Sequence, residues 1–92
     1  MSIAVKKLAK QIGIKEDELV AVGVRAYIKS ELGKTEAQLH VLYHKYGIKS
    51  IKDLERTIEK GTVVESDVFE DLTKIDYLES KKTKFKKLIL TI

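Results

Sequence analysis

The sequence predicts an all-α protein: a small helical domain with a long central helix and a long C-terminal amphipathic helix. Its 92 residues include no proline, the residue that most often interrupts a helix. The stretch 19–28 carries one charge in ten residues, although 35% of the chain is charged, and a helix that is apolar all round must be covered all round. Between residues 68 and 92, apolar side chains recur about every 3.5 residues, which favours packing along another helix.

The first predicted helix covers residues 1–12. Four apolar positions share one of its faces: Val5, Leu8, Ala9 and Ile12. Three lysines lie off that face and are candidate contacts for nucleic acid: Lys6, Lys7 and Lys10. Gly13 follows the last apolar position, where a helix commonly ends on a left-handed residue.

The central helix is predicted to begin near Lys15, with three acids in its first turn. Alternating β-branched residues between 20 and 28 would also suit a strand, but the flanking sequences favour a helix. Gly33 leaves two alternatives. Either it ends this helix and Thr35 with Gln38 caps a new one, or the helix continues to Tyr46, which the lack of proline favours. We expect residues 19–28 to be the buried axis of the fold.

The second half of the chain predicts two more helices. Ser50 caps a helix over residues 51–60, with Asp53 in a box-like cap. Residues 62–65 are expected to be an extended connector, and Ser66 or Asp67 to cap the last helix. Residues 88–92 are too apolar for a solvated tail, and we expect them to dock on a neighbouring chain as helix, strand or tail.

Composition limits the class of protein. Residues 1–92 are predicted to be one domain, without a secretion signal or a membrane span. The lack of cysteine excludes disulfides and favours a cytoplasmic setting. The net charge of +4 is unevenly distributed along the chain, which has an acidic block followed by a basic block. Residues 65–79 hold six acids and one lysine, and residues 81–87 hold five lysines and no acid. Such a chain can pair with itself or with a charged partner.

No residue set predicts an enzyme, a cofactor or a metal. His40, His44 and Glu36 have helical spacing for zinc, but the set lacks a fourth ligand, and two exposed histidines are the preferred interpretation. Arg25, the only charge in 19–28, is expected to reach the surface or to pair with an acid. Two further groups are interpreted as solvated helix faces: the acids Asp67, Glu70, Asp71 and Glu79, which would pair with lysines, and the lysines Lys81, Lys82, Lys84, Lys86 and Lys87. For the lysines, contact with nucleic acid or with an acidic partner is the alternative.

The run from Leu8 to Ile28 resembles the two helices of ribbon-helix-helix proteins. The resemblance is carried by Gly13-Ile14, Glu18-Leu19-Val20, Gly23-Val24-Arg25 and Tyr27-Ile28. It implies a dimer, and in that family a strand before the first helix reads DNA. Here only residues 1–5 could form that strand, and Lys15 and Asp17 replace the usual phosphate-binding hydroxyl residues.

The second half, at residues 46–55, 59–61 and 69–72, resembles small uncharacterised helical proteins common in archaea, several of them suspected antitoxins. This resemblance implies a protein that binds another protein. Our leading hypothesis is therefore a non-enzymatic helical protein-binding module of antitoxin type, and the alternative is a DNA-binding regulator of ribbon-helix-helix type. Residues 1–33 would form a homodimer and residues 34–92 would bind a toxin-like protein.

Two residue sets carry this hypothesis. The predicted dimer interface consists of Leu19, Val22, Gly23, Ala26 and Tyr27. The predicted partner-binding face consists of Leu78, Lys82, Phe85, Leu88, Ile89 and Ile92.

Overall fold

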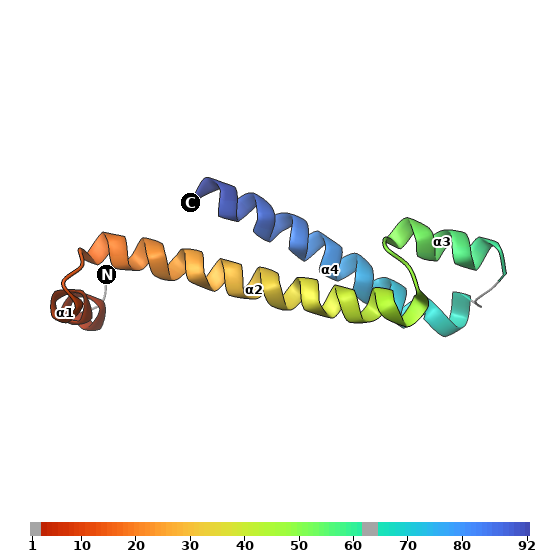
Figure 1. Cartoon of the computed structure of the whole chain (residues 1–92), viewed down its shortest axis with the longest axis horizontal. Coiled ribbons are helices and arrows are strands. Elements are labelled where there is room, and N and C mark those ends of the chain that lie inside the picture. The colour runs from red at the N-terminus through yellow and green to blue at the C-terminus, as the bar shows by residue number, and fades with distance from the viewer. Residues whose placement is uncertain (1–2, 62–64) are drawn as a thin grey trace.

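A computed structural model describes residues 3–61 and 65–92 of the chain. In these residues it has four α-helices and no strand: α1 (Ile3–Ile12), α2 (Glu16–Tyr46), α3 (Ile51–Glu59) and α4 (Glu65–Thr91). The all-α class, the long central helix and the long C-terminal helix are confirmed (Figure 1).

The molecule is a rod that measures 61 × 20 × 18 Å. Helix α4 runs back along α2, and the two make most of the contacts between helices. Helix α1 lies across one end of α2, and α3 lies at the opposite end beside the start of α4 (Figure 1). The last residue of the chain, Ile92, comes level with Arg25, whose Nη1 donates to the Ile92 carbonyl at 3.0 Å. The first nine residues of α2 therefore project beyond the end of α4.

Helix α2 runs through Gly33 without a break, so the prediction of a continuous helix to Tyr46 is confirmed. Thr35 does not cap a new helix. It is buried, with 1% of its surface exposed, and its hydroxyl donates to the Glu31 carbonyl at 2.8 Å. The helix ends at Gly47, which is left-handed with φ of 63°, a conformation in which a glycine carries no steric penalty.

The core lies in the half of the rod where α2, α3 and α4 meet. It is a cluster of five buried side chains: Leu39, Leu42, Leu54, Ile75 and Leu78. Leu54 and Ile75 have no exposed surface. Each of the three helices contributes to this cluster, so it fixes their relative positions.

The interpretation of residues 19–28 as a buried axis is wrong within one chain. Only Ile28 is buried in that stretch, at 7% exposed, whereas Val22 and Tyr27 are 56% and 63% exposed. The physical reason is the length of α4, which ends level with Arg25 and so leaves the first turns of α2 without a second helix beside them.

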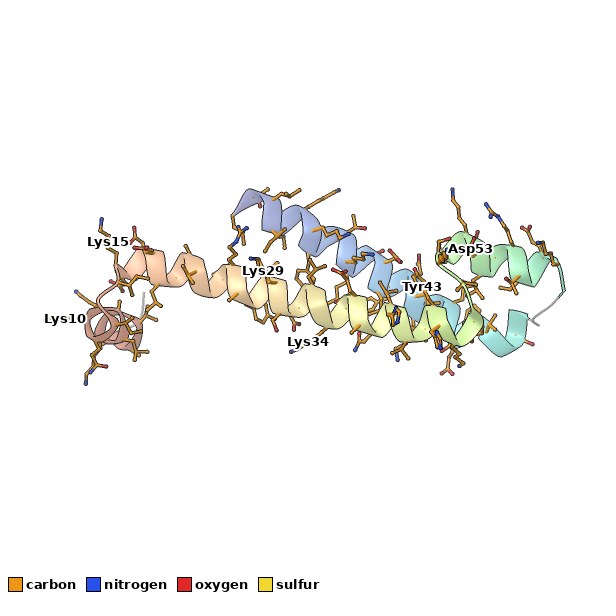
Figure 2. The ribbon with its side chains drawn as sticks, in the orientation of Figure 1. Lys10, Lys15, Lys29, Lys34, Tyr43 and Asp53 are labelled. Carbon is orange, nitrogen blue, oxygen red and sulfur yellow. The ribbon has the colours of Figure 1, made fainter. Side chains whose placement is uncertain are left out.

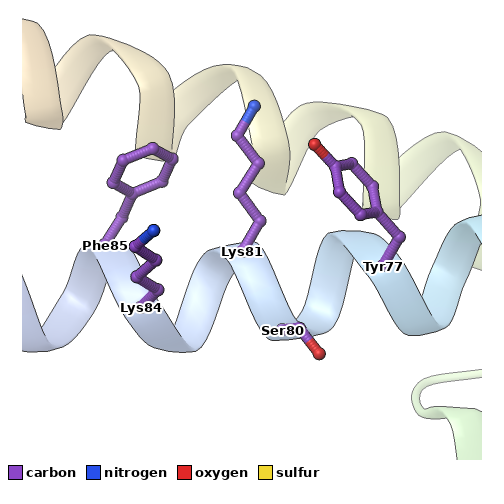
Figure 3. Close-up of a pocket in the computed structure, with 5 residues that line it drawn as sticks. All are labelled: Tyr77, Ser80, Lys81, Lys84 and Phe85. Atoms are coloured by element: carbon purple, nitrogen blue, oxygen red, sulfur yellow. The ribbon is translucent and has the colours of Figure 1, made fainter.

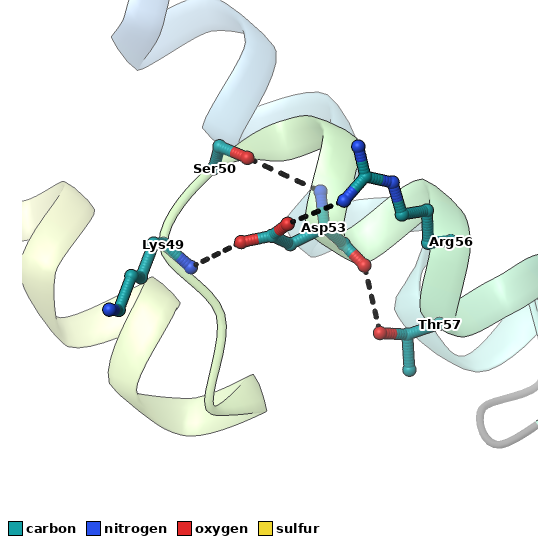
Figure 4. A network of polar contacts seen from close by, with 5 residues as sticks. All are labelled: Lys49, Ser50, Asp53, Arg56 and Thr57. Carbon is teal, nitrogen blue, oxygen red and sulfur yellow. Dashed lines mark hydrogen bonds and ion pairs between the residues drawn. The ribbon is translucent and has the colours of Figure 1, made fainter.

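The cap of α3 is confirmed in detail (Figure 4). The Ser50 hydroxyl accepts from the Asp53 amide at 3.3 Å, and the Asp53 carboxylate accepts from the Lys49 amide at 3.1 Å. The same carboxylate lies 3.5 Å from the Arg56 guanidinium. Two free amides at the helix start are thus satisfied by side chains.

Helix α4 begins at Glu65, so the prediction that Ser66 or Asp67 caps it is wrong. Hydroxyl and acidic residues are favoured throughout the first turn as well as at the cap, so the sequence does not separate the two positions. Of the predicted connector at 62–65, residues 62–64 lie outside the described residues, and Glu65 belongs to α4. At the other end, residues 88–91 continue the helix, which decides between helix, strand and tail.

Candidate protein-binding surface

Exposed apolar side chains gather at one end of the rod. Ten of the thirteen large hydrophobic side chains that are exposed in the described residues lie there, and we call this surface the apolar end: Ile3, Leu8, Ile12, Val20, Val22, Val24, Tyr27, Leu88, Leu90 and Ile92. They come from α1, the first turns of α2 and the last turn of α4 (Figure 1). Single exposed hydrophobic residues are ordinary, but a group of this extent is typical of a surface that binds another protein.

The predicted dimer residues lie on the apolar end. Val22, Gly23, Ala26 and Tyr27 are exposed, and Leu19 is half-buried. A Cβ atom added at Gly23 would meet no atom of the chain within 4 Å. These residues are therefore free to contact a second molecule, although Val22 and Tyr27 point to different sides of the helix.

The predicted partner-binding face is only partly available. Leu78 is 2% exposed and belongs to the core, so its assignment to a partner is wrong. Lys82, Phe85 and Ile89 are half-buried, whereas Leu88 and Ile92 are exposed. The physical reason is that α2 of the same chain takes the place of the helix that the spacing predicts. Leu90, which is 84% exposed, lies in the segment 88–92 that is expected to dock, but outside the apolar stripe that carries the predicted face.

A hollow of about 300 Å³ opens on one side of the α2–α4 pair (Figure 3). It is lined by Tyr77, Ser80, Lys81, Lys84 and Phe85, all from α4. The Lys81 ammonium lies 5.6 Å from the centre of the Phe85 ring and 4.0 Å from a Glu31 carboxylate oxygen. An aromatic ring edged by ammonium groups suits contact with an apolar and acidic partner segment.

Polar contacts join α2 to α4 near the core. Tyr43 lies between the two helices and donates to the Glu79 carboxylate (Figure 2). Lys45 and Tyr46 both donate to one oxygen of Asp71, at 2.6 and 2.5 Å. Burial, and then the hydrogen bond and charge of Glu79, raise the pKa of Tyr43 far above its usual range. Two of the four predicted acids, Asp71 and Glu79, therefore hold the helix pair together.

We expect the contribution of Asp71 to stability to depend on pH. The hydrogen bonds from Lys45 and Tyr46 lower the pKa of Asp71 below its ordinary value of 3.8. The pKa of Asp71 is lower in the folded state than in the unfolded state. The full contribution of Asp71 to stability is therefore present at pH values above the unfolded-state pKa, and it is lost as the pH falls through the folded-state pKa. Asp71→Asn should cost on the order of 1 kcal/mol at neutral pH, from the bond of Tyr46 to a charged acceptor. Urea unfolding between pH 2 and about 7 measures this difference, which should shrink towards zero in acid.

Asp76→Asn is the matched control for this experiment, because Asp76 is an exposed acid of the same helix with no ion pair in the described residues. A difference between Asp71→Asn and the unchanged protein that stays constant down to the lowest pH would contradict the expectation.

The histidine pair is exposed on α2. The rings of His40 and His44 are stacked, with centroids 6.4 Å apart. Within residues 3–61 and 65–92, no group of three or more histidine, cysteine or acidic side chains is placed to hold a metal ion. Arg25 reaches the surface, as predicted, and its guanidinium donates to the main-chain oxygen of Ile92.

The candidate nucleic-acid contacts are solvent-exposed on α1. Lys6, Lys7 and Lys10 are all exposed, and Lys10 points away from α2 (Figure 2). Residues 3–5, however, belong to α1, so the strand that a ribbon-helix-helix protein uses to read DNA cannot run through them. In the part of the chain that the structure describes, no helix is both long and apolar enough to cross a bilayer.

Comparison with known proteins places the chain among uncharacterised proteins. The model of the Uncharacterized protein MJ0235 family matches residues 1–92. Over 63 residues the chain is 29% identical to "Uncharacterized protein MJ0235" of the archaeon Methanocaldococcus jannaschii. The aligned region covers 68% of this chain and 77% of the relative. No solved structure matches. The predicted resemblance to small uncharacterised archaeal proteins agrees with this result.

Proposed function

The chain belongs to the Uncharacterized protein MJ0235 family, and we propose that it is a cytoplasmic, non-enzymatic protein-binding module. The observation that carries this proposal is the apolar end, with ten large exposed hydrophobic side chains on three helices. Water contact with such a surface is unfavourable by about 25 cal/mol for each Å² of apolar area that a partner could bury. A protein partner is the simplest means of removing that area from water.

The rest of the fold supports the same proposal. The core and the contacts of Tyr43 and Asp71 lie towards the other end of the rod, so they hold the α2–α4 pair without using the apolar end. The binding surface is thus presented by helices that are fixed elsewhere. The resemblance to suspected antitoxins implies a dimerising N-terminal part and a long helix that covers a toxin, and we propose the same class of partner here.

The experiment uses the product of the adjacent gene as the partner, co-expressed with the full chain. Leu90→Asp should raise the dissociation constant of the complex at least tenfold, because a carboxylate would replace an apolar contact, while the melting temperature of the free chain stays the same. Isothermal titration calorimetry and thermal unfolding measure the two effects.

Phe69→Asp is the matched control, since Phe69 is an exposed apolar residue of α4 at the other end of the rod, 62% exposed. Equal losses for Leu90→Asp and Phe69→Asp, or no complex at all, would count against the proposal. Salt-dependent binding of promoter DNA that is lost on Lys6→Glu and Lys10→Glu would instead favour the regulator.

A further inference from the structure

The projecting start of α2 has the features of one half of a self-complementary interface. Nine residues, Glu16–Val24, precede the level of Arg25 and Ile92, which corresponds to about 14 Å of helix. After its acidic first turn this segment is apolar and mostly exposed, and α4 does not run beside it.

One side of α2 carries a stripe of residues whose charges complement those of a second, reversed copy of the same stripe. Its members follow one another at intervals of four and three residues, which keeps them on one side of a helix: Glu16, Val20, Gly23, Tyr27, Ser30 and Lys34. The stripe starts with an acid, ends with a base and has apolar and small residues between them. Reversing its direction therefore places each end against the opposite charge.

We propose that a second copy of the chain docks on this stripe in antiparallel orientation, about a twofold axis level with Arg25. In this arrangement, a residue of one α2 helix faces a residue of the other when their two numbers add up to about 50. Glu16 faces the second copy's Lys34, and Gly23 faces the second copy's Tyr27. Each of these pairs occurs twice because of the symmetry.

The charges fit this arrangement. Among the described residues, Glu16, Asp17 and Glu18 form no ion pair, and Lys34 pairs only with Glu31 of its own helix while 71% exposed. Lys34 points away from α2 into solvent (Figure 2). Docking would bring Glu16 of one copy to Lys34 of the other.

The hollow on α4 lies at the same level. The contacts Arg25–Ile92 and Tyr46–Asp71 show that residue numbers at one level of α2 and α4 add up to about 117, so Lys84 is level with Gly33. The ion pair of Glu31 with Lys81 places the hollow on the side of α2 that carries the stripe, because Glu31 lies one turn beyond Tyr27. Glu16 would therefore lie near Lys84 as well as Lys34 of the second copy.

The apolar contacts also match. Tyr27 is 63% exposed and would lie over Gly23 of the second copy, where no side chain obstructs an aromatic ring. Helix α1 would lie just beyond the second copy's Lys34, towards Val41 and Tyr77. Both of these residues are exposed, at 67% and 62%, and they lie outside the apolar end. The arrangement thus gives a use to two exposed side chains that nothing else in the fold explains.

This inference rests on the proposed function, in that both require the apolar end to bind protein, but it specifies the occupant. The test is a charge exchange measured by sedimentation equilibrium at low ionic strength. Glu16→Lys and Lys34→Glu should each raise the dissociation constant of the dimer at least tenfold, because each change replaces two attractive pairs by two repulsive ones. An equimolar mixture of the two variants should recover the dimer, since all cross-pairs are attractive again.

Glu18→Lys and Lys29→Glu are the matched controls. They make the same charge changes on the same helix, but Glu18 is turned about 160° from Glu16 and Lys29 about 140° from Lys34. Both controls should leave the dimer within about twofold of the unchanged protein.

A monomeric unchanged protein, a mixture no more dimeric than its components, or controls as damaging as the exchange variants would overturn the proposal. A monomer that still binds the product of the adjacent gene would refute this dimer and leave the proposed function standing. A dimer that binds no such partner would support this dimer and refute the proposed function.

Discussion

Replacing Ile75 by alanine should lower the free energy of unfolding by about 3 kcal/mol, the largest loss we expect from a single change. Ile75 has no exposed surface and sits in the cluster where α2, α3 and α4 meet. The lost transfer free energy and the cavity that remains both destabilise the fold, and a chain of 92 residues has little stability in reserve. Urea unfolding followed by circular dichroism measures the loss.

Phe69→Ala is the control for this measurement, since it removes a large apolar side chain of α4 that is 62% exposed. It should change the free energy of unfolding by less than about 0.5 kcal/mol. Both proteins must be compared at one concentration, because self-association would add to the apparent stability. A loss below 1 kcal/mol for Ile75→Ala would mean that the cluster is not the core of the fold.

Replacing Leu54 by alanine should lower the free energy of unfolding by a similar amount, but it should loosen a different set of helices. Leu54 is the only buried residue of α3 and has no exposed surface. Its truncation should cost about 2–3 kcal/mol and act first on the contacts of α3 with α4. We expect amide hydrogen exchange of residues 51–59 to accelerate most, while the amides of α2 and α4 near the polar contacts stay better protected.

Ile75→Ala should instead accelerate amide hydrogen exchange throughout the core. The two variants therefore distinguish local opening of α3 from unfolding of the whole core. Glu55→Ala, an exposed change in α3, is the matched control and should leave exchange in all helices nearly unchanged. Equal acceleration in α2 and α3 for Leu54→Ala would show that α3 does not open separately.

Local features of the fold could be predicted from sequence because they depend on neighbours along the chain. The α1 face, the continuous α2 through Gly33 and the Ser50–Asp53 cap each arise from residues within about one turn of one another. The extent of α4 along α2 depends on tertiary packing. For that reason the sequence analysis placed Leu19–Ile28 inside the fold and Leu78 on a partner, where the structure has nearly the reverse.

The candidate surface could be predicted only in part for the same reason. The apolar stripe of the last helix indicates that it packs on another helix, but it cannot tell whether that helix belongs to the same chain. The structure assigns most of the stripe to α2 and leaves Leu88, Leu90 and Ile92 exposed. The antitoxin class and the dimer remain proposals that the experiments above test.

The length of the rod has a practical consequence for how this protein will behave in solution. Its radius of gyration is 19.4 Å, whereas a compact chain of 92 residues would have about 12 Å. A compact protein with that radius would contain roughly three times as many residues. A single chain should therefore diffuse more slowly than a compact protein of the same mass and leave a size-exclusion column earlier than that protein. The elution volume alone would report the shape of this molecule and could be mistaken for its mass.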